Sequence, residues 1–411
     1  MRWILILLIV LIIITGCSVE AKEQGQIPVI NEAMQLKLSF GDDETGPSEF
    51  LLARPQSVDA NNRGEIVVLD ENKLKVFTPE GKPLKTVGRS GEGPNEFDRP
   101  VRMSISPDNT VYVRGYPFFS TLTSDFEFIE KRRFNNLSFY SDMLKQNGWL
   151  YAGLDKAMSF GDIRVFRIKG DMMISENEGK DHFVLAHIEN GEMSVITDYI
   201  SLFPSSLSFK TGENQSMGLG YHFEYMFDFF SIPAMTDKVV YCNTDEGRDM
   251  INNKMNYILH VYDINTKTEK TYSFPFDPVV MTDDFLDSEF RTDPWNDSEM
   301  VKYTVGFNKR MKQVAKKRKY FASLTRLVSD GKYVFAFTWQ KGIDPVTGAD
   351  LGSLAHVIDI ESGELVSKSY FKTIPQIIKN GTAYKIVRQE NEFPRIEVYK
   401  INPDVYGKDI N

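Results

Sequence analysis

Short apolar runs alternate with polar residues and stop at turn-forming residues, beginning at residue 55. This alternation predicts β-strands, because successive side chains of a strand point to opposite faces of its sheet. Turns rich in Asn, Gly and Pro separate the runs at residues 61–64 and 79–82. We therefore predict four strands in this unit, at residues 55–60, 65–69, 74–77 and 84–87.

The unit occurs twice. The motif Gly46-Pro47-Ser48-Glu49-Phe50 returns as Gly93-Pro94-Asn95-Glu96-Phe97, and Arg54-Pro55 returns 45 residues later as Arg99-Pro100. At the same offset, the strand at residues 65–68 falls on residues 110–113. A repeat of about 45 residues with four strands is typical of a β-propeller blade. We expect Phe50 and Phe97 to fill the space between neighbouring blades.

Later segments keep the strand pattern without the motif. Residues 148–151 and 163–168 are predicted to belong to a third blade, and residues 183–188 and 194–197 to begin a fourth. Further strands are predicted at residues 238–241, 257–262, 270–274, 333–338, 355–359, 365–370, 382–387 and 395–401. The predicted fold is all-β, a six-bladed propeller of four-stranded antiparallel blades over residues 29–411.

A ring of sheets also needs a closing contact. Residues 34–40 alternate like a strand and precede the first repeat. We predict that they pair with residues 395–401 and complete the last blade, because closure removes the exposed edges of an open array.

Residues 276–327 interrupt the strand pattern. The first part of this insertion is acidic and the second is basic, and Met311, Val314 and Ala315 are spaced as one face of a helix. We expect a partly helical insertion packed by that face. Its basic face is either a lid or docking surface at one mouth of the propeller, or a solvated face balanced by the nearby acids.

The amino terminus predicts the cellular location of the protein. Eleven apolar residues at positions 4–14 are too few for a spanning helix but suit a secretory signal peptide. The run ends in Ile14-Thr15-Gly16-Cys17, which resembles the lipobox of bacterial lipoproteins. The resemblance implies a signal peptide at residues 1–16, lipid attachment with fatty acids such as palmitate at Cys17, and a flexible tether at residues 17–28. Ser18 in place of Asp implies, by likeness to Gram-negative lipoproteins, the outer membrane, with the periplasmic or surface side left open.

Composition and net charge limit the classes of molecule that the protein is expected to bind. The 411 residues are 42% hydrophobic, which excludes a disordered chain, and carry a net charge of −9. An acidic surface repels phosphate backbones, so we expect no nucleic acid partner. The expected partners are the membrane, through the lipid, and a protein or glycan of the envelope. Cys242 is the only cysteine besides Cys17, so we predict a buried strand residue and no disulfide within the mature chain.

The first two units resemble NHL-repeat propellers, through the glycine motif and the strand Gly64-Glu65-Ile66-Val67-Val68-Leu69-Asp70. With the lipobox, the chain is similar to the six-bladed NHL- or TolB-like propeller lipoproteins of Gram-negative envelopes. The motifs cover residues 46–129, and beyond them the resemblance is architectural. It implies the fold more than an activity, because most such lipoproteins have none assigned.

Some NHL-like propellers are lactonases or lyases that hold a metal in the central channel. Such a site needs several His, Asp, Glu or Asn side chains from the innermost strands. His260 and His356 precede valines in similar strands and either occupy equivalent positions in a site or pack away from the channel. The acidic groups at residues 42–44 and 283–284 lack the spacing of a calcium loop and are interpreted as surface charges. No cofactor is predicted, although a divalent cation such as calcium in the channel is left open.

Arginines are the predicted ligand-binding residues. Arg54 and Arg99 stand at equivalent starts of the innermost strands, and Arg102 lies on the polar face of the second of them. Together they could bind an anionic ligand at the propeller mouth, or they pair with neighbouring acids such as the motif glutamate. No catalytic residue and no metal ligand is predicted.

The preferred hypothesis is a non-catalytic, lipid-anchored envelope propeller that binds a protein, peptide or glycan at a loop face. The alternative is a metal-dependent hydrolase or lyase with its site in the channel, and a third is a structural part of an envelope complex. The aromatic residues at positions 221–230 are either a glycan platform or the interior face of a strand.

Overall fold

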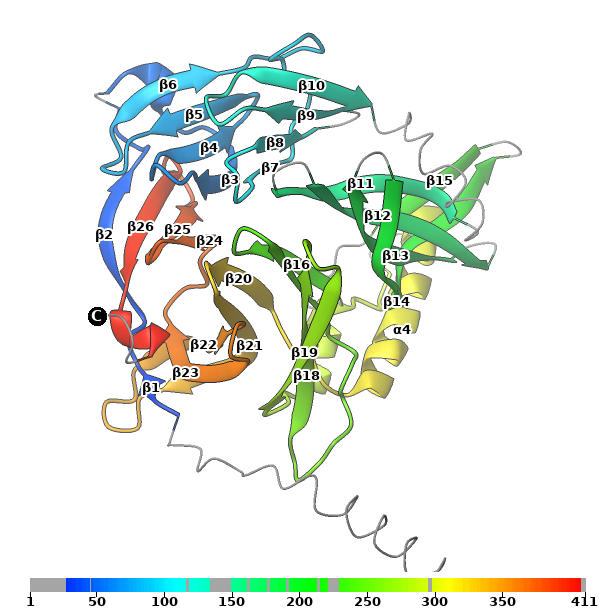
Figure 1. Cartoon of the computed structure of the whole chain (residues 1–411). Helices are drawn as coiled ribbons and strands as arrows, with labels where there is room; N and C mark the ends of the chain where they lie inside the picture. Colours follow the sequence, from blue (N-terminus) through cyan, green and yellow to red (C-terminus); the bar gives the residue numbers. More distant parts are fainter. Residues whose placement is uncertain are drawn as a thin grey trace, which may run out of the picture.

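The computed structural model describes residues 27–44, 46–115, 118–133, 149–160, 163–175, 178–189, 192–212, 215–220, 229–294 and 298–407. Its strands form six separate sheets arranged around a central axis (Figure 1). The all-β class and the six-bladed ring predicted from the repeats are confirmed. Each sheet has four antiparallel strands, and two sheets gain a fifth strand.

The first two sheets follow the repeat closely. The first contains β3 (Pro55–Ala60), β4 (Ile66–Asp70), β5 (Lys73–Phe77) and β6 (Pro83–Val87), in that order from the axis outward. The second contains β7 (Arg102–Ile105), β8 (Val111–Arg114), β9 (Phe118–Leu122) and β10 (Phe128–Arg133). The strands of the first sheet match their predicted bounds within one residue, and β8 matches the predicted residues 110–113 equally well.

The third sheet differs from the prediction. It contains β11 (Trp149–Phe160), β12 (Ile163–Ser175), β13 (Glu178–Glu189), β14 (Glu192–Gly212) and β15 (Gln215–Gly220). The segments assigned to a third and a fourth blade are thus neighbours in one sheet, in which β12 pairs with β13 from Arg164↔Ile188 to Ser175↔Glu178. Strands of 12 and 13 residues fill the length in which the earlier repeat places two strands and a turn.

The remaining sheets use the rest of the chain. The fourth contains β16 (Phe229–Ala234), β17 (Lys238–Asn243), β18 (Met255–Asp263) and β19 (Thr268–Phe276). The fifth contains β20 (Arg326–Asp330), β21 (Tyr333–Ile343), β22 (Asp350–Asp359) and β23 (Glu364–Phe371), with the short β1 (Val29–Ile30) parallel to its outer strand. The sixth contains β24 (Ile377–Lys379), β25 (Thr382–Val387), β26 (Arg395–Ile401) and β2 (Met34–Phe40).

The predicted closing contact is confirmed. β2 pairs antiparallel with β26 from Met34↔Ile401 to Phe40↔Ile396, so the two ends of the described chain share the sixth sheet (Figure 1). Met34 and Ile401 are both buried in one hydrophobic cluster that also contains residues of the fifth sheet. The closing strand therefore joins two neighbouring blades.

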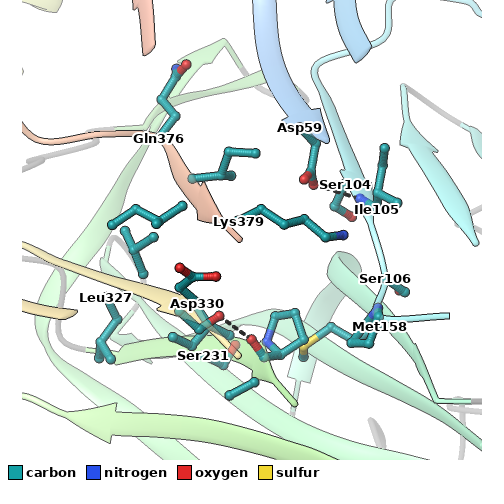
Figure 2. A pocket seen from close by; sticks show the side chains of 18 of the residues that line it. Asp59, Ser104, Ile105, Ser106, Met158, Ser231, Leu327, Asp330, Gln376 and Lys379 are labelled. Atoms are coloured by element: carbon teal, nitrogen blue, oxygen red, sulfur yellow. Dashed lines mark hydrogen bonds between the residues drawn. The ribbon is translucent and has the colours of Figure 1, made fainter. Parts of the chain in front are cut away.

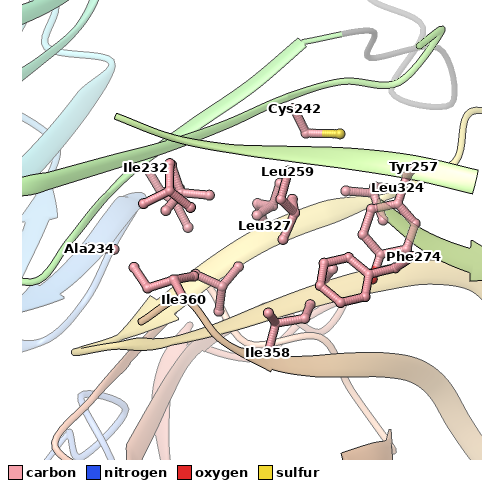
Figure 3. Close-up of a cluster of buried hydrophobic side chains, with 14 of the residues drawn as sticks. Ile232, Ala234, Cys242, Tyr257, Leu259, Phe274, Leu324, Leu327, Ile358 and Ile360 are labelled. Atoms are coloured by element: carbon pink, nitrogen blue, oxygen red, sulfur yellow. The ribbon is translucent and has the colours of Figure 1, made fainter. Parts of the chain in front are cut away.

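The core consists of apolar clusters between adjacent sheets rather than one central core. Phe50 packs with residues of the first and sixth sheets, and Phe97 packs with residues of the first and second. The predicted role of the motif phenylalanine is therefore correct. Figure 3 shows the cluster between the fourth and fifth sheets, in which Leu259 and Ile358 face each other. Cys242 is fully buried nearby, as predicted, and burial raises the pKa of its thiol.

The insertion between β19 and β20 contains α3 (Asp283–Glu289) and α4 (Glu299–Arg318). Ser298 caps α4 by accepting the backbone N–H of Val301, and three basic residues in the last turn suit the negative end of the helix dipole. Met311 and Ala315 are fully buried, as the predicted face requires, in a cluster that also holds Trp339 of β21.

Acidic residues balance part of the basic face of α4. Lys312 pairs with Asp287, and Lys316 pairs with Asp283 at 2.7 Å. Among the described residues, none of α3 or α4 lines the axial cavity described below. The structure therefore favours the solvated interpretation of this face over a lid.

Several predictions fall on other parts of the chain. The signal peptide, Cys17 and most of the aromatic segment at residues 221–230 lie outside the described residues. Phe229 at the end of that segment is buried in β16. In the described part of the chain, no helix is long and apolar enough to span a bilayer.

Candidate functional site

A large cavity lies on the axis of the ring. Its volume is about 580 Å³, and residues of all six sheets line it, mostly from the innermost strands β3, β7, β11, β16, β20 and β24. Small-molecule sites in proteins range from about 300 to 1,000 Å³. The cavity is therefore large enough for a small ligand or for the end of a longer one.

Polar side chains on the innermost strands bridge from one blade to the next. The Oγ of Ser57 accepts the backbone N–H of Met103 at 2.8 Å, and a carboxylate oxygen of Asp59 accepts that of Ile105 at 2.8 Å. An innermost strand has no sheet neighbour on its axial side, so these side chains satisfy donors that would otherwise face the cavity. They also fix the spacing of the first two blades.

Similar bonds occur at each of the five remaining junctions between neighbouring sheets. Between the second and third sheets, Ser106 accepts the backbone N–H of Ser159 at 2.7 Å, and between the third and fourth, Arg167 donates to the carbonyl of Phe229 at 3.5 Å. Between the fourth and fifth sheets, Ser329 donates to the carbonyl of Pro233 at 2.5 Å, and between the fifth and sixth, Asp330 accepts the N–H groups of Asn380 and Gly381 at 2.7 and 2.8 Å. Between the sixth and first sheets, Lys379 donates to the carbonyl of Ala60 at 2.9 Å. The wall of the cavity is thus held by side chains as well as by sheet packing.

The order of these bonds shows that the innermost strands run in the same direction along the axis. Residues near the start of one strand bond residues near the start of the next, as Ser57 and Met103 do, and residues near the end bond residues near the end, as Lys379 and Ala60 do. The first residues of the strands therefore share one mouth of the cavity, and the last residues share the other.

One mouth collects arginines. Arg102 begins β7, Arg326 begins β20, and Arg167 of β12 reaches the first residue of β16. We call these three residues the arginine mouth. The Nη2 of Arg326 donates to the carbonyl of Gln376 at 3.3 Å, which ties its guanidinium to the start of β24.

The opposite end contains Asp59, Asp330 and Lys379, which we call the aspartate end. Figure 2 shows the side chain of Lys379 lying between the two carboxylates. Asp330 also accepts a hydrogen bond from the hydroxyl of Tyr406 at 2.5 Å. Burial raises the pKa of that phenol, and the negative charge of Asp330 raises it further. Burial lowers the pKa of Lys379, and the two carboxylates oppose that shift.

The cavity has a different charge from the protein. Four basic and two acidic residues line it, a net charge of +2, whereas the whole chain carries −9. The carboxylates of the aspartate end are engaged by backbone N–H groups and lie beside Lys379. Three of the four basic lining residues are those of the arginine mouth.

The structure brings one of the three predicted arginines to the cavity. Arg102 lines it, whereas Arg54 and Arg99 are exposed and are not among the lining residues. Arg99 lies beside Asp98 at 3.4 Å, and the motif residue Glu96 pairs with Arg89 instead. Arg54 and Arg99 precede β3 and β7, so neither belongs to an innermost strand.

Sequence reasoning missed Arg167 and Arg326. Arg326 is recognisable afterwards, because it starts a short strand that leads through a turn into a Tyr-Val pair, as Arg102 does. Arg167 lies on the second strand of a sheet whose strands are unusually long, and no repeat marks its position.

His260 and His356 lie in the third strands of their sheets, β18 and β22, and neither lines the cavity. The ring nitrogens of His260 face Glu246 at 2.8 Å and Glu269 at 3.0 Å. His356 is buried, with its Nδ1 3.0 Å from the hydroxyl of Tyr257, and burial lowers the pKa of its imidazole to about 3. Both histidines therefore sit away from the channel.

The described residues of the channel do not fit a metal ion. Among the described residues, no three His, Cys, Asp or Glu side chains are placed to hold a metal ion. Asp59 and Asp330 direct their oxygens at backbone N–H donors, and the ammonium of Lys379 lies near both. The acidic residues 42–44 are exposed, and Asp283 pairs with Lys316.

No protein-family model and no curated protein matches the chain. Among solved structures, the chain is similar to a candidate exported protein of Bacteroides fragilis, at 14% identity and a TM-score of 0.29, over 61% of this chain and 80% of that one. It is also similar to a Bacteroides caccae protein of unknown function, at 12% identity and a TM-score of 0.31, over 77% and 82% of the two chains. The WD40 domain of Neurospora crassa Pan2 matches at 8% identity and a TM-score of 0.35, over 86% and 77%. At these scores the matches assign neither a family nor a function, and the fold rests on the strand order given above.

Proposed function

We propose that the chain is a non-catalytic binding protein of the bacterial cell envelope, anchored by lipid at Cys17. Its ligand, a peptide or glycan or a segment of a partner protein, would enter the axial cavity from one mouth. The observation that carries this proposal is a cavity of about 580 Å³ to which all six blades contribute side chains.

The construction of the cavity wall supports binding. The blade-to-blade hydrogen bonds of Ser57, Asp59, Asp330 and Lys379 hold the lining strands in one arrangement. A preformed site loses little conformational entropy when a ligand binds. The loops at the two mouths can differ in sequence without disturbing this frame, which suits recognition.

The proposed location in the cell rests on the sequence. The lipobox resemblance at residues 14–17 supports a lipid anchor, and Ser18 supports the outer membrane of a Gram-negative cell. Growth with labelled palmitate should label the wild-type chain and leave Cys17→Ala unlabelled. A Cys17→Ala chain that still carries the label and stays in the membrane fraction would contradict the anchor.

The cavity is tested by filling it. Ser104 of β7 lines the cavity and is half-buried, so Ser104→Trp should block it. Ser39→Trp, at an exposed position of β2, is the matched control. Envelope glycans and peptides that bind the wild type on arrays should lose at least tenfold in affinity with Ser104→Trp and be unchanged with Ser39→Trp. Equal binding by Ser104→Trp would move the site out of the cavity.

A metal-dependent hydrolase or lyase is not proposed, because the described cavity residues do not fit a metal site.

A further inference from the structure

We infer that the axial cavity selects a ligand with a carboxylate group, which is held at the arginine mouth by Arg102, Arg167 and Arg326. This inference rests on the proposed function, because it names the chemistry of the ligand that the cavity binds. The three residues come from the second, third and fifth sheets: Arg102 and Arg326 begin innermost strands, and the guanidinium of Arg167 donates to the first residue of another.

Charge separates this cavity from the rest of the surface. A protein of net charge −9 repels small anions in general, whereas its axial cavity carries +2. A recess lined by one sign of charge and walled by protein focuses the field and concentrates ions of the opposite sign. An anion that approaches this molecule is therefore favoured at the arginine mouth.

The kind of cation favours a carboxylate. A guanidinium is planar, always charged, and presents N–H donors in a fork that matches the two oxygens of a carboxylate. Arg167 and Arg326 are tethered to the carbonyls of Phe229 and Gln376, so their guanidinium groups are held beside the mouth.

The aspartate end determines the direction in which the bound ligand lies along the axis. A carboxylate placed there would lie near Asp59 and Asp330 and would be repelled by both. The ligand therefore lies along the axis with its carboxylate at the arginine mouth and its neutral or hydroxylated part toward Lys379. The volume of about 580 Å³ limits it to a small molecule or to the terminal unit of a chain.

Matched pairs of probes test the charge requirement by isothermal titration of the wild-type protein at low salt. Trigalacturonate is compared with its methyl ester, and acetyl-Ala-Ala is compared with its amide. We expect at least one acid to bind at least tenfold more tightly than its neutral partner, and the pair with the larger difference tells a uronate from a peptide terminus. Inorganic phosphate is the third arm, and phosphate binding tighter than either acid would overturn the carboxylate assignment.

Charge-removing variants then place the carboxylate. Arg102→Gln and Arg326→Gln should each weaken the acidic probe at least fivefold and leave the neutral probe unchanged. Arg132→Gln, at an exposed position on the outer strand β10, is the matched control and should bind as the wild type does. An acidic probe that binds Arg102→Gln and Arg326→Gln as tightly as the wild type would overturn the inference.

The two proposals fail differently. A neutral probe that binds as tightly as its acid, and that Ser104→Trp displaces, would refute the carboxylate and leave the binding function standing. If the wild type binds none of the probes and no array ligand depends on the cavity, both proposals fail.

Discussion

The ammonium group of Lys379 donates a hydrogen bond to the carbonyl oxygen of Ala60, with an Nζ···O distance of 2.9 Å. The two residues are 319 positions apart and belong to the sixth and first sheets. The bond lies at the junction where the last blade meets the first. Lys379 therefore links the blade that β2 completes to the beginning of the repeat array.

Lys379→Met should lower the free energy of unfolding by about 1–2 kcal/mol, because it leaves a carbonyl without its donor and two carboxylates without a nearby cation. Urea denaturation measures the change. Lys82→Met, at an exposed position, should change stability by less than about 0.5 kcal/mol. Equal stability of the two variants would show that the Lys379 bond does not stabilise the ring.

The closing strand β2 gives a second prediction. Met34 is 8% exposed and packs in a cluster of the fifth and sixth sheets, whereas Leu36 on the same strand is 52% exposed. Met34→Ala should cost about 2–3 kcal/mol of stability, and Leu36→Ala less than about 0.5 kcal/mol. Thermal unfolding followed by circular dichroism distinguishes them. A larger loss from Leu36→Ala would contradict the described register of β2.

A buried ion pair gives a third prediction. Asp70 and Lys75 approach to 2.7 Å with side chains that are 0% and 8% exposed, and Asp70 also accepts the backbone N–H groups of Ala53 and Arg54. Lys75→Met should cost about 3–5 kcal/mol, because it leaves a buried carboxylate without its cation. Arg132→Met breaks the exposed pair with Glu130 and should cost at most about 1 kcal/mol. Similar costs in denaturant titrations would show that burial does not decide the energetics here.

His356 predicts a loss of stability in mild acid. Its pKa is about 3 in the folded chain and 6.5 for an unperturbed imidazole, so the unfolded chain binds the proton more readily. The stability contributed by neutral His356 is complete above about pH 6.5 and falls as the pH drops toward 3, by about 2.5 kcal/mol at pH 4.5.

Urea titrations at pH 7 and pH 4.5 test this pH dependence. His356→Gln keeps an acceptor for the hydroxyl of Tyr257 but carries no titrating group. Its loss of stability between the two pH values should be about 2.5 kcal/mol smaller than that of the wild type. An equal loss in both proteins would assign the acid sensitivity to other groups.

The sequence predicts the first two blades well and the third poorly, for a physical reason. In the first two, most turns contain Gly, Asn or Pro where a strand ends, so the local sequence marks the strand bounds. In the third, β13 and β14 are 12 and 21 residues long, and the chain gives no local sign that they belong to one sheet with β11. Partner choice between strands depends on contacts across the fold, which a local pattern does not contain.

Only part of the cavity lining was predicted from the sequence. The expectation that arginines gather at a mouth of the propeller led to Arg102, but equivalence of sequence position also selected Arg54 and Arg99. Those two precede the innermost strands and do not line the cavity. Arg167 comes from a second strand, so only the three-dimensional arrangement reveals it.

The pairing of β2 with β26 has a consequence for how the protein is made. A ribosome produces β2 near the beginning of translation and β26 near its end, so the early strand must wait unpaired while the other blades form. During that interval the growing chain has an open edge that can join to other molecules. A message that stops before β26 therefore yields an aggregation-prone product rather than a smaller working ring.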